Sequence, residues 1–178
     1  MTPRDDTSTP WSVPVRVEAV GAGLTRRLVA EESVRERVAK ALDLAGLDSL
    51  EAEVEVRPVL DTHYEIRGRF KAAVVYTCGV TLETFPSEVD GDFDMRATTD
   101  PAAVSYEDSG EITLETLDPP DLIEHGVLDL GAYVVEQLAL ELDPFPRKPG
   151  VEFENPAQEA EPSPFAKLAQ LKLNEPER

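Results

Sequence analysis

The sequence predicts an α+β fold, with a mostly antiparallel β-sheet and a few helices packed on one of its faces. Several segments in the N-terminal half alternate apolar and charged side chains with a period of two, which is typical of half-buried strands. Two other segments have the longer period of helices. Short turn sequences separate neighbouring strands, which favours antiparallel pairing over parallel pairing, because parallel strands need long crossovers.

The first predicted elements are a strand and an amphipathic helix. Residues 13–17 alternate as a strand, and Pro14 favours an edge position because proline has no N–H to donate to a neighbour. Ser33 and Glu36 have the spacing of a capping box, which predicts a helix from about Val34 to Ala45. Gly46 is expected to end this helix, whose apolar side should pack on the sheet.

Alternating patterns predict further strands at residues 50–60, 63–77, 89–95 and 111–117. The first two are separated only by Asp61-Thr62, so we expect them to form a hairpin. The apolar run that begins at Val74 continues as far as Leu82.

A row of cations is predicted on one face of the strand at 63–77. Arg67, Arg69 and Lys71 are two residues apart, so their side chains point to the same side of the strand. This row is the best candidate in the chain for contacting phosphate. The alternative is that Glu53 and Glu55 of the preceding strand face these cations and form ordinary cross-strand ion pairs.

The most apolar helix candidate extends from Leu130 to Leu142. Asp129 can cap its N-terminus, and Pro144 and Pro146 follow where helices stop. Apolar side chains lie almost all round this helix, so we expect it to be buried rather than half-exposed. Glu136 interrupts them, and a buried glutamate would need a partner such as an arginine of the sheet.

No catalytic motif is present, and we predict no enzyme activity, cofactor or metal site. The single cysteine, Cys78, excludes an internal disulfide and a zinc site built from cysteines alone. Phosphate-binding, dinucleotide-binding, zinc-protease and nucleophile-elbow motifs are missing. Cys78 with His63 or His125 can formally supply a nucleophile and a base. Acidic clusters such as Asp92 with Asp94 can formally serve acid–base chemistry. A small buried hydrophobe is the better interpretation of the thiol.

The formal charge of −19 is unevenly distributed along the chain. It is −2 over residues 1–71, −14 over 72–150 and −3 over 151–178. The acidic middle repels phosphates on average, which argues against DNA binding, and it suits a basic protein partner. The alternative is that the carboxylates only keep the protein soluble. The chain has neither a long apolar run nor a basic leader segment, so we expect a cytoplasmic protein that does not bind membranes.

The chain is expected to contain one domain, residues 11–150, between a disordered N-terminus at 1–10 and a flexible acidic, proline-rich tail at 151–178. Within the tail, residues 163–172 form a short amphipathic segment that would dock on a partner or on its own domain. Binding candidates outside the sheet are two cations after the apolar helix and three apolar side chains of the tail. They are Arg147, Lys148, Phe165, Leu168 and Leu171.

Several stretches at fitting separations resemble the YceD family, a bacterial and plastid domain whose members are named for accumulation of large-subunit ribosomal RNA. They are residues 78–85, the acidic strand that follows, and residues 122–130, 136–140, 143–150 and 164–172. The resemblance extends over about residues 11–172. Many members carry Cys-x-x-Cys where this chain has Cys78 and Thr81, so a metal or redox role of a cysteine pair is not expected here.

This resemblance implies a non-enzymatic accessory factor in ribosomal RNA accumulation or large-subunit assembly. Such a factor would bind a ribosomal protein, an assembly factor or ribosomal RNA. The acidic middle of the chain favours a basic ribosomal protein or assembly factor as the direct partner. Two alternatives remain: a scaffold that recruits a partner through its C-terminal tail, and a hydrolase or transferase that uses Cys78 or an acidic cluster.

Overall fold

The computed structural model describes residues 9–60, 62–104 and 119–152, and it confirms the predicted α+β fold. A five-stranded sheet has the order β2-β3-β4-β5-β6, and a separate two-stranded ribbon joins β1 to β7. Neighbouring strands pair antiparallel, except that β6 adds in parallel to β5. The strands are β1 (Pro14–Arg16), β2 (Leu24–Val29), β3 (Gly46–Leu60), β4 (His63–Thr77), β5 (Thr84–Thr98), β6 (Asp121–Leu122) and β7 (Val127–Asp129).

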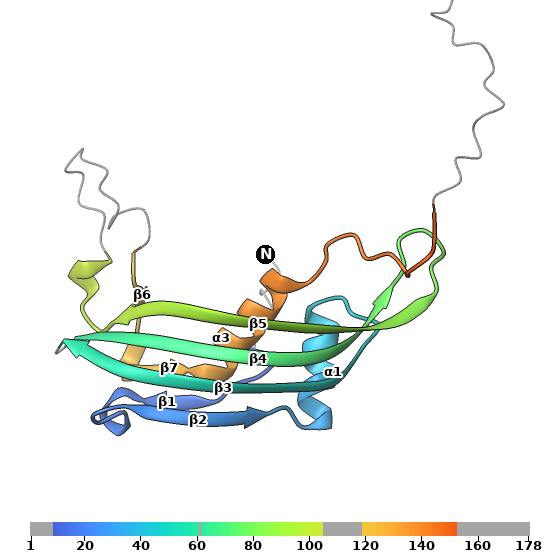
Figure 1. Cartoon of the computed structure of the whole chain (residues 1–178). Coiled ribbons are helices and arrows are strands. Elements are labelled where there is room, and N and C mark those ends of the chain that lie inside the picture. Colours follow the sequence, from blue (N-terminus) through green and yellow to red (C-terminus); the bar gives the residue numbers. More distant parts are fainter. Residues whose placement is uncertain (1–8, 61, 105–118, 153–178) are drawn as a thin grey trace, which may run out of the picture.

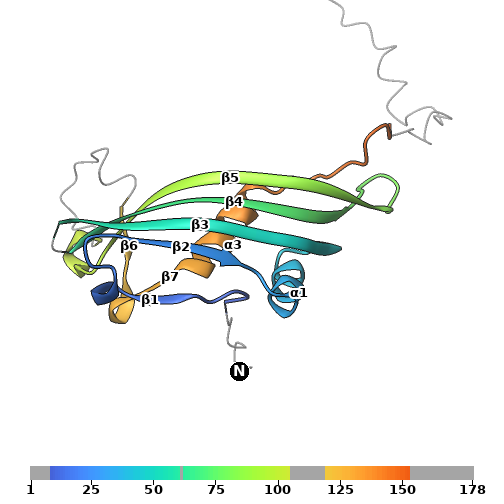
Figure 2. The ribbon, with the colours of Figure 1, turned by 60° about the horizontal axis from the view of Figure 1, so that its bottom comes forward.

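The two described α-helices lie on the same face of the sheet, together with the β1–β7 ribbon (Figure 2). Figure 1 shows α3 crossing obliquely behind β4 and β5, while α1 packs near the start of β3. In the described part of the chain nothing covers the opposite face, which we call the open face. The helices are α1 (Glu32–Ala41) and α3 (Leu130–Glu141), with short 3₁₀ turns η1 (Val17–Ala19), η2 (Pro101–Ala103) and η3 (Glu124–Gly126).

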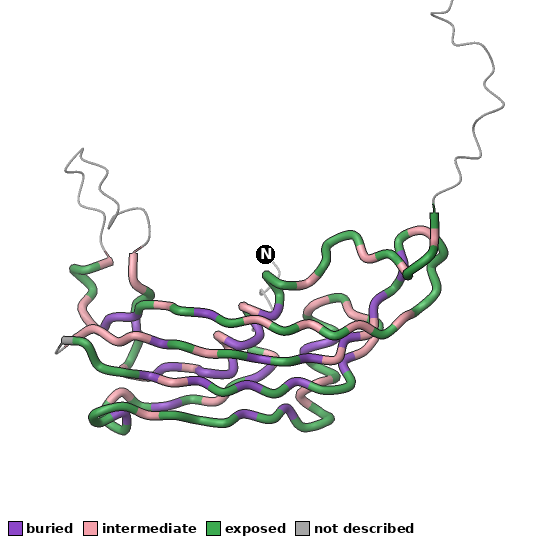
Figure 3. Tube along the Cα trace, in the orientation of Figure 1, coloured by how far each residue is buried: buried purple, intermediate pink, exposed green. Residues whose placement is uncertain are grey.

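The core lies between the sheet and α3. Along β3 and β4 buried and exposed residues alternate (Figure 3), because every second side chain points toward the helices. Fully buried side chains of the two layers meet there; they are Val54, Val56, Ile66 and Val74 from the sheet and Leu130, Val134 and Leu138 from α3. None of the described helices has the length and apolar character needed to span a bilayer.

Two glycines of the sheet let aromatic rings lie flat against it. Phe93 stands opposite Gly68 in the β4–β5 register, and Phe70 stands opposite Gly91. A Cβ atom on Gly68 would overlap the Phe93 ring, and one on Gly91 would lie 2.9 Å from the Phe70 ring and 3.1 Å from Cγ of Glu141. The missing side chains therefore allow α3 to approach β5 closely.

Asp129 ties the N-terminal segment to α3. Its carboxylate accepts hydrogen bonds from the N–H groups of Gly131 and Ala132, at 3.1 and 3.2 Å, and so caps the helix as expected. It also accepts bonds from Ser12 Oγ at 2.6 Å and from the Val13 N–H at 2.7 Å. This one side chain thereby holds together the N-terminus of α3 and the segment that leads into β1.

Several details of the two helices differ from the sequence-based predictions. The capping box was wrong: α1 begins at Glu32, its N-cap Glu31 makes no side-chain cap bond, and Ser33 lies within the helix. The predicted end at Ala45 was also wrong, because the chain leaves the helix after Ala41 and enters β3 at Gly46.

The prediction that the 130–142 helix is buried all round was wrong. Leu140 is 73% exposed, and Glu136 is exposed too, so it needs no buried partner. The sheet covers one side of α3 and Trp11 packs against its first turn at Gly131, whereas Glu136, Ala139 and Leu140 are exposed.

The strand pattern also needed correction. Strand β2 was missed because only Leu28 among its residues is buried. The apolar run to Leu82 is strand only as far as Thr77, and β5 begins at Thr84 rather than Val89. The predicted strand at 111–117, the predicted amphipathic segment at 163–172 and most of the predicted disordered N-terminus at 1–10 lie outside the described residues.

Replacing Asp129 by alanine should lower the free energy of unfolding by about 2 kcal/mol, because the variant loses a helix cap and the two bonds to Ser12 and Val13. Urea denaturation followed by circular dichroism measures this. The exposed Asp48→Ala variant is the control and should change stability by less than about 0.5 kcal/mol. Equal stability of the two variants would contradict the role given to Asp129.

Candidate functional site

The turn between β4 and β5 is held by its own backbone. The Cys78 N–H donates to the Glu83 carbonyl and the Leu82 N–H donates to the Cys78 carbonyl, both at 2.9 Å. Leu82 has φ of +61° and its side chain is 77% exposed. A non-glycine residue seldom adopts this left-handed conformation, so the two backbone hydrogen bonds offset the conformational free energy that it costs.

The segment after α3 runs back along this turn and is bonded both to the turn and to the end of β4. The Gly79 N–H donates to the Pro146 carbonyl at 2.9 Å, and the Asp143 N–H donates to the Tyr76 hydroxyl at 3.1 Å. Lys148 Nζ forms an ion pair with Glu83 at 2.8 Å. We call residues 78–83 and 143–150 together the Cys78 clasp.

Cys78 is completely buried at the centre of the clasp, where its sulfur accepts the N–H groups of Lys148 and Val80, each at 3.4 Å. The Lys148 N–H, followed by the Thr81 side chain and backbone, lowers the pKa of the thiol to about 6, against the opposing effect of burial. The predicted burial of Cys78 is thus confirmed. Its neighbours are backbone donors rather than a general base.

Neither histidine lies near the thiol. His63 opens β4 and Cys78 follows the end of this strand, so the two are separated by the whole strand, roughly 50 Å at the usual rise per residue. His125 follows β6, which pairs with β5 at Thr98, directly opposite His63. Both histidines therefore belong to the end of the sheet that is remote from Cys78.

The open face of the sheet has charges arranged in three rows, one on each of its long strands. In the strand registers, the three cations of β4 stand between glutamates of β3 and aspartates of β5. The rows are Glu51, Glu53 and Glu55; Lys71, Arg69 and Arg67; and Asp90, Asp92 and Asp94. Each cation is thus flanked by a carboxylate on both sides, as the ion-pair interpretation of the sequence expected.

Two of the three cations form ion pairs across strands. Arg67 Nε lies 2.8 Å from Asp94 and Arg69 Nη2 lies 3.0 Å from Glu53. The bond to Asp94 raises the pKa of the Arg67 guanidinium further, which leaves it permanently charged. These pairs are exposed to solvent, so each stabilises the fold only weakly. The carboxylates of the two flanking rows thus surround the cation row with negative charge.

The remaining sequence-predicted residues are spread over the molecule. Lys148 belongs to the Cys78 clasp, whereas Arg147 is exposed and makes no ion pair within the described residues. Arg147 lines a cleft of about 440 Å³ between the clasp and β5, where the side chains of Glu88, Asp90 and Glu141 also lie. The structure does not bring Arg147 and Lys148 into one patch with the β4 cations, because the acidic row of β5 intervenes. Phe165, Leu168 and Leu171 lie outside the described residues.

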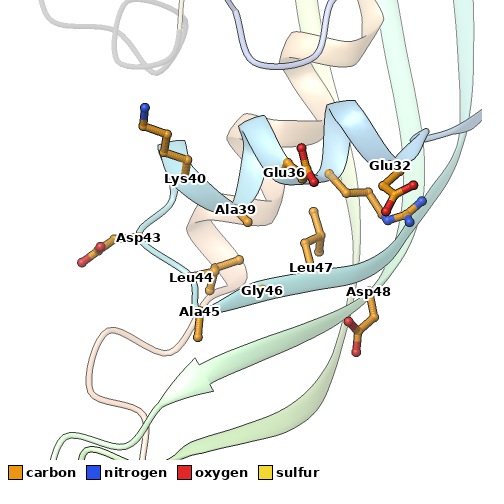
Figure 4. A pocket seen from close by; sticks show the side chains of 11 residues that line it. Glu32, Glu36, Ala39, Lys40, Asp43, Leu44, Ala45, Gly46, Leu47 and Asp48 are labelled. Carbon is orange, nitrogen blue, oxygen red and sulfur yellow. The ribbon is translucent and has the colours of Figure 1, made fainter.

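A second hollow, of about 650 Å³, separates α1 from the beginning of β3 (Figure 4). Leu44 and Leu47 occupy the space between helix and strand, while the charged ends of Lys40, Asp43 and Asp48 point away from it. No set of polar groups converges there, which an orienting ligand site would need. We therefore assign this hollow no binding role.

The chain belongs to the YceD family, described as large ribosomal RNA subunit accumulation protein YceD, whose family model matches residues 66–172. The match begins in β4 and includes the charged row of β5, α3 and the Cys78 clasp. No functionally curated protein matches the chain, and no solved structure does. The resemblance expected from the clasp and α3 residues is confirmed.

The Cys78 thiol should make stability depend on pH. Its folded pKa of about 6 lies below the value of about 8.5 for an unfolded thiol, so the unfolded state binds more protons between these values. The contribution is fully present above pH 8.5 and is lost as the pH falls through 6. Urea midpoints of the wild type and of Cys78→Ala, measured from pH 5.5 to 9, should therefore converge toward low pH. A constant difference would contradict this ionisation.

Reversing the charge of Lys148 should weaken the Cys78 clasp, because Lys148→Glu places a second carboxylate beside Glu83. We expect the melting temperature to fall by only a few degrees, since an ion pair that is exposed to solvent is weak. Arg147→Glu is the matched control and should leave stability nearly unchanged. Thermal melts distinguish the two, and equal losses would assign a structural role to Arg147 as well.

Proposed function

We propose that this protein is a non-enzymatic accessory factor in the accumulation of large-subunit ribosomal RNA, and that it acts by binding a basic ribosomal protein or assembly factor. The observation that carries the proposal is the family match over residues 66–172, since the family description names this role. Of the partners that this role allows, a basic protein is favoured over RNA by the charges of the sheet.

Direct binding of RNA through the β4 cations has little support in the geometry. Three cations stand between six carboxylates in the adjacent rows, so a phosphate approaching Arg69 would also approach Glu53 and Asp92. Breaking the ion pairs to free the guanidinium groups would leave those carboxylates unpaired beside the phosphate. The same surface attracts lysine and arginine side chains, because its outer rows are acidic.

The alternative of a thiol-dependent hydrolase or transferase also has little support. A nucleophilic cysteine needs a substrate path and a base, whereas the Cys78 sulfur is enclosed and receives backbone N–H groups. A structural thiol explains the same bonds. The Lys148 N–H, the Thr81 side chain and backbone, and the Val80 N–H account for the low pKa of Cys78 without a neighbouring base.

The full chain, immobilised at low salt, should retain proteins of the large ribosomal subunit or its assembly factors from a mixture of dissociated bacterial subunits, because its acidic surface complements theirs. Mass spectrometry identifies the retained proteins and sequencing the retained RNA. An unrelated protein of equal length and net charge is the control. If neither ribosomal components nor assembly factors are enriched over this control, the proposed role fails.

The same experiment distinguishes protein from RNA as the direct partner. Treating the mixture with ribonuclease should leave the retained proteins bound if a basic protein is contacted directly. Arg67→Glu with Arg69→Glu should then have little effect on capture. If capture is lost both after ribonuclease treatment and in the Arg67→Glu, Arg69→Glu variant, the direct contact is with RNA.

A further inference from the structure

Over most of its length β5 is an edge strand of the described sheet. On one side it pairs with β4 along its whole length, from Thr84 to Thr98. On the other side only Ala97 and Thr98 pair, with β6, so the backbone from Thr84 to Met95 has no strand partner among the described residues. Figure 1 shows β5 as the outermost long strand of the sheet. Such an edge is a template for another strand.

The two faces along this edge have different chemistry. On the open face stand Glu88, Asp90, Asp92 and Asp94, all exposed, and only Asp94 forms an ion pair within the described chain. On the helix face stand apolar side chains that are partly or fully buried; they are Phe85, Val89, Phe93 and Met95. The edge is thus acidic on one side and apolar on the other.

The end of α3 forms a floor beside this edge. Glu141 of its last turn lies beneath Gly91 of β5, and the helix continues past the strand toward the clasp (Figure 1). Leu140 in that turn is 73% exposed and Phe145 after it is 79% exposed. At the Phe85–Asp90 part of the edge, the cleft of about 440 Å³ between β5 and the clasp adds the carboxylates of Glu141 and Asp143.

We propose that the β5 edge binds an extended segment of a basic protein by strand addition. Its main chain would pair with β5 between Ser87 and Met95, beyond Pro86, which has no N–H to donate. Its Lys or Arg side chains would face Asp90 and Asp92, and its apolar side chains would cover Leu140. This inference rests on the proposed function for the kind of partner. It adds the place and the mode of binding, in which backbone pairing supplies affinity and alternating side chains supply selectivity.

Charge complementarity favours this occupant over two others. A second copy of the chain would place its own β5 aspartates beside these aspartates, and like charges on adjacent strands are destabilising. The chain's residues 111–117 would bring Glu111 and Glu115 to the same acidic face. A segment that alternates basic and apolar residues has neither conflict.

The test uses the full chain and a synthetic peptide of about eight alternating lysine and valine residues, the length of an ordinary strand. The peptide should bind, and the outward-pointing amides of β5 should gain protection from hydrogen exchange. A peptide of the same sequence with every backbone nitrogen methylated keeps its charge but has no N–H group to donate to β5, so its affinity should fall by about tenfold or more.

Charge variants locate the binding site. Asp90→Lys with Asp92→Lys should weaken peptide binding by about tenfold or more. Glu32→Lys with Glu36→Lys makes the same change of net charge on α1, far from β5, and should have a much smaller effect. Circular dichroism of both variants checks that the fold is kept.

Four results would overturn the inference. Equal binding of the methylated peptide excludes strand addition, and equal weakening by both charge variants excludes the β5 edge. If the β5 amides are already protected from hydrogen exchange without peptide, a second copy of the chain or residues 111–117 occupy the edge. Light scattering distinguishes these two cases, because only a second copy doubles the mass. If ribosomal partners are captured but Asp90→Lys with Asp92→Lys has no effect on capture, the inference fails while the proposed function stands. If the peptide binds as expected but no ribosomal partner is found, only the proposed function fails.

Discussion

One carboxylate organises the apolar half of this fold. Asp129 accepts four hydrogen bonds, two from the first turn of α3 and two from the segment that leads into β1. Gly131 allows the backbone of Trp11 to come so close that a Cβ atom there would lie 2.6 Å from its carbonyl oxygen. These contacts fix where α3 begins, and thus which strands it crosses. The approach of its last turn to Gly91, and the exposure of Leu140 next to β5, follow from that placement.

The same charges that stabilise the open face also determine what it can bind. Cross-strand ion pairs occupy Arg67 and Arg69, and the acidic row of β5 lies on the outer side of the cations. A basic row read from one strand is therefore misleading by itself. Its effect depends on which residues the neighbouring strands bring opposite to it, and the register places carboxylates there on both sides.

The sequence predicted the parts of the fold in which periodicity is strong. The alternation in residues 50–60 and 63–77 predicted the β3–β4 hairpin and the pairing of Glu53 with Arg69, because side chains opposite each other in a hairpin follow from its turn. The cap by Asp129 was likewise predictable from local chemistry. The exposed side of α3 was not, since a helix made almost entirely of apolar residues does not reveal that only one face has a sheet against it. The clasp could not be predicted, because it depends on contacts between segments about 65 residues apart. The unpaired edge of β5 could not be predicted either, because it depends on the strand order of the sheet.

The β1–β7 ribbon has a consequence for the order in which the chain folds. Its Val13–Asp129 bond joins residues 116 positions apart, whereas β3, β4 and β5 are successive hairpin neighbours. Contacts between close segments form before contacts that require long loops to close. During synthesis the three long strands can assemble while β1 is still unpaired, because its partner β7 emerges from the ribosome more than a hundred residues later. Until then the apolar face of the sheet has no α3 to cover it, and a nascent chain stalled before Asp129 would carry this face exposed.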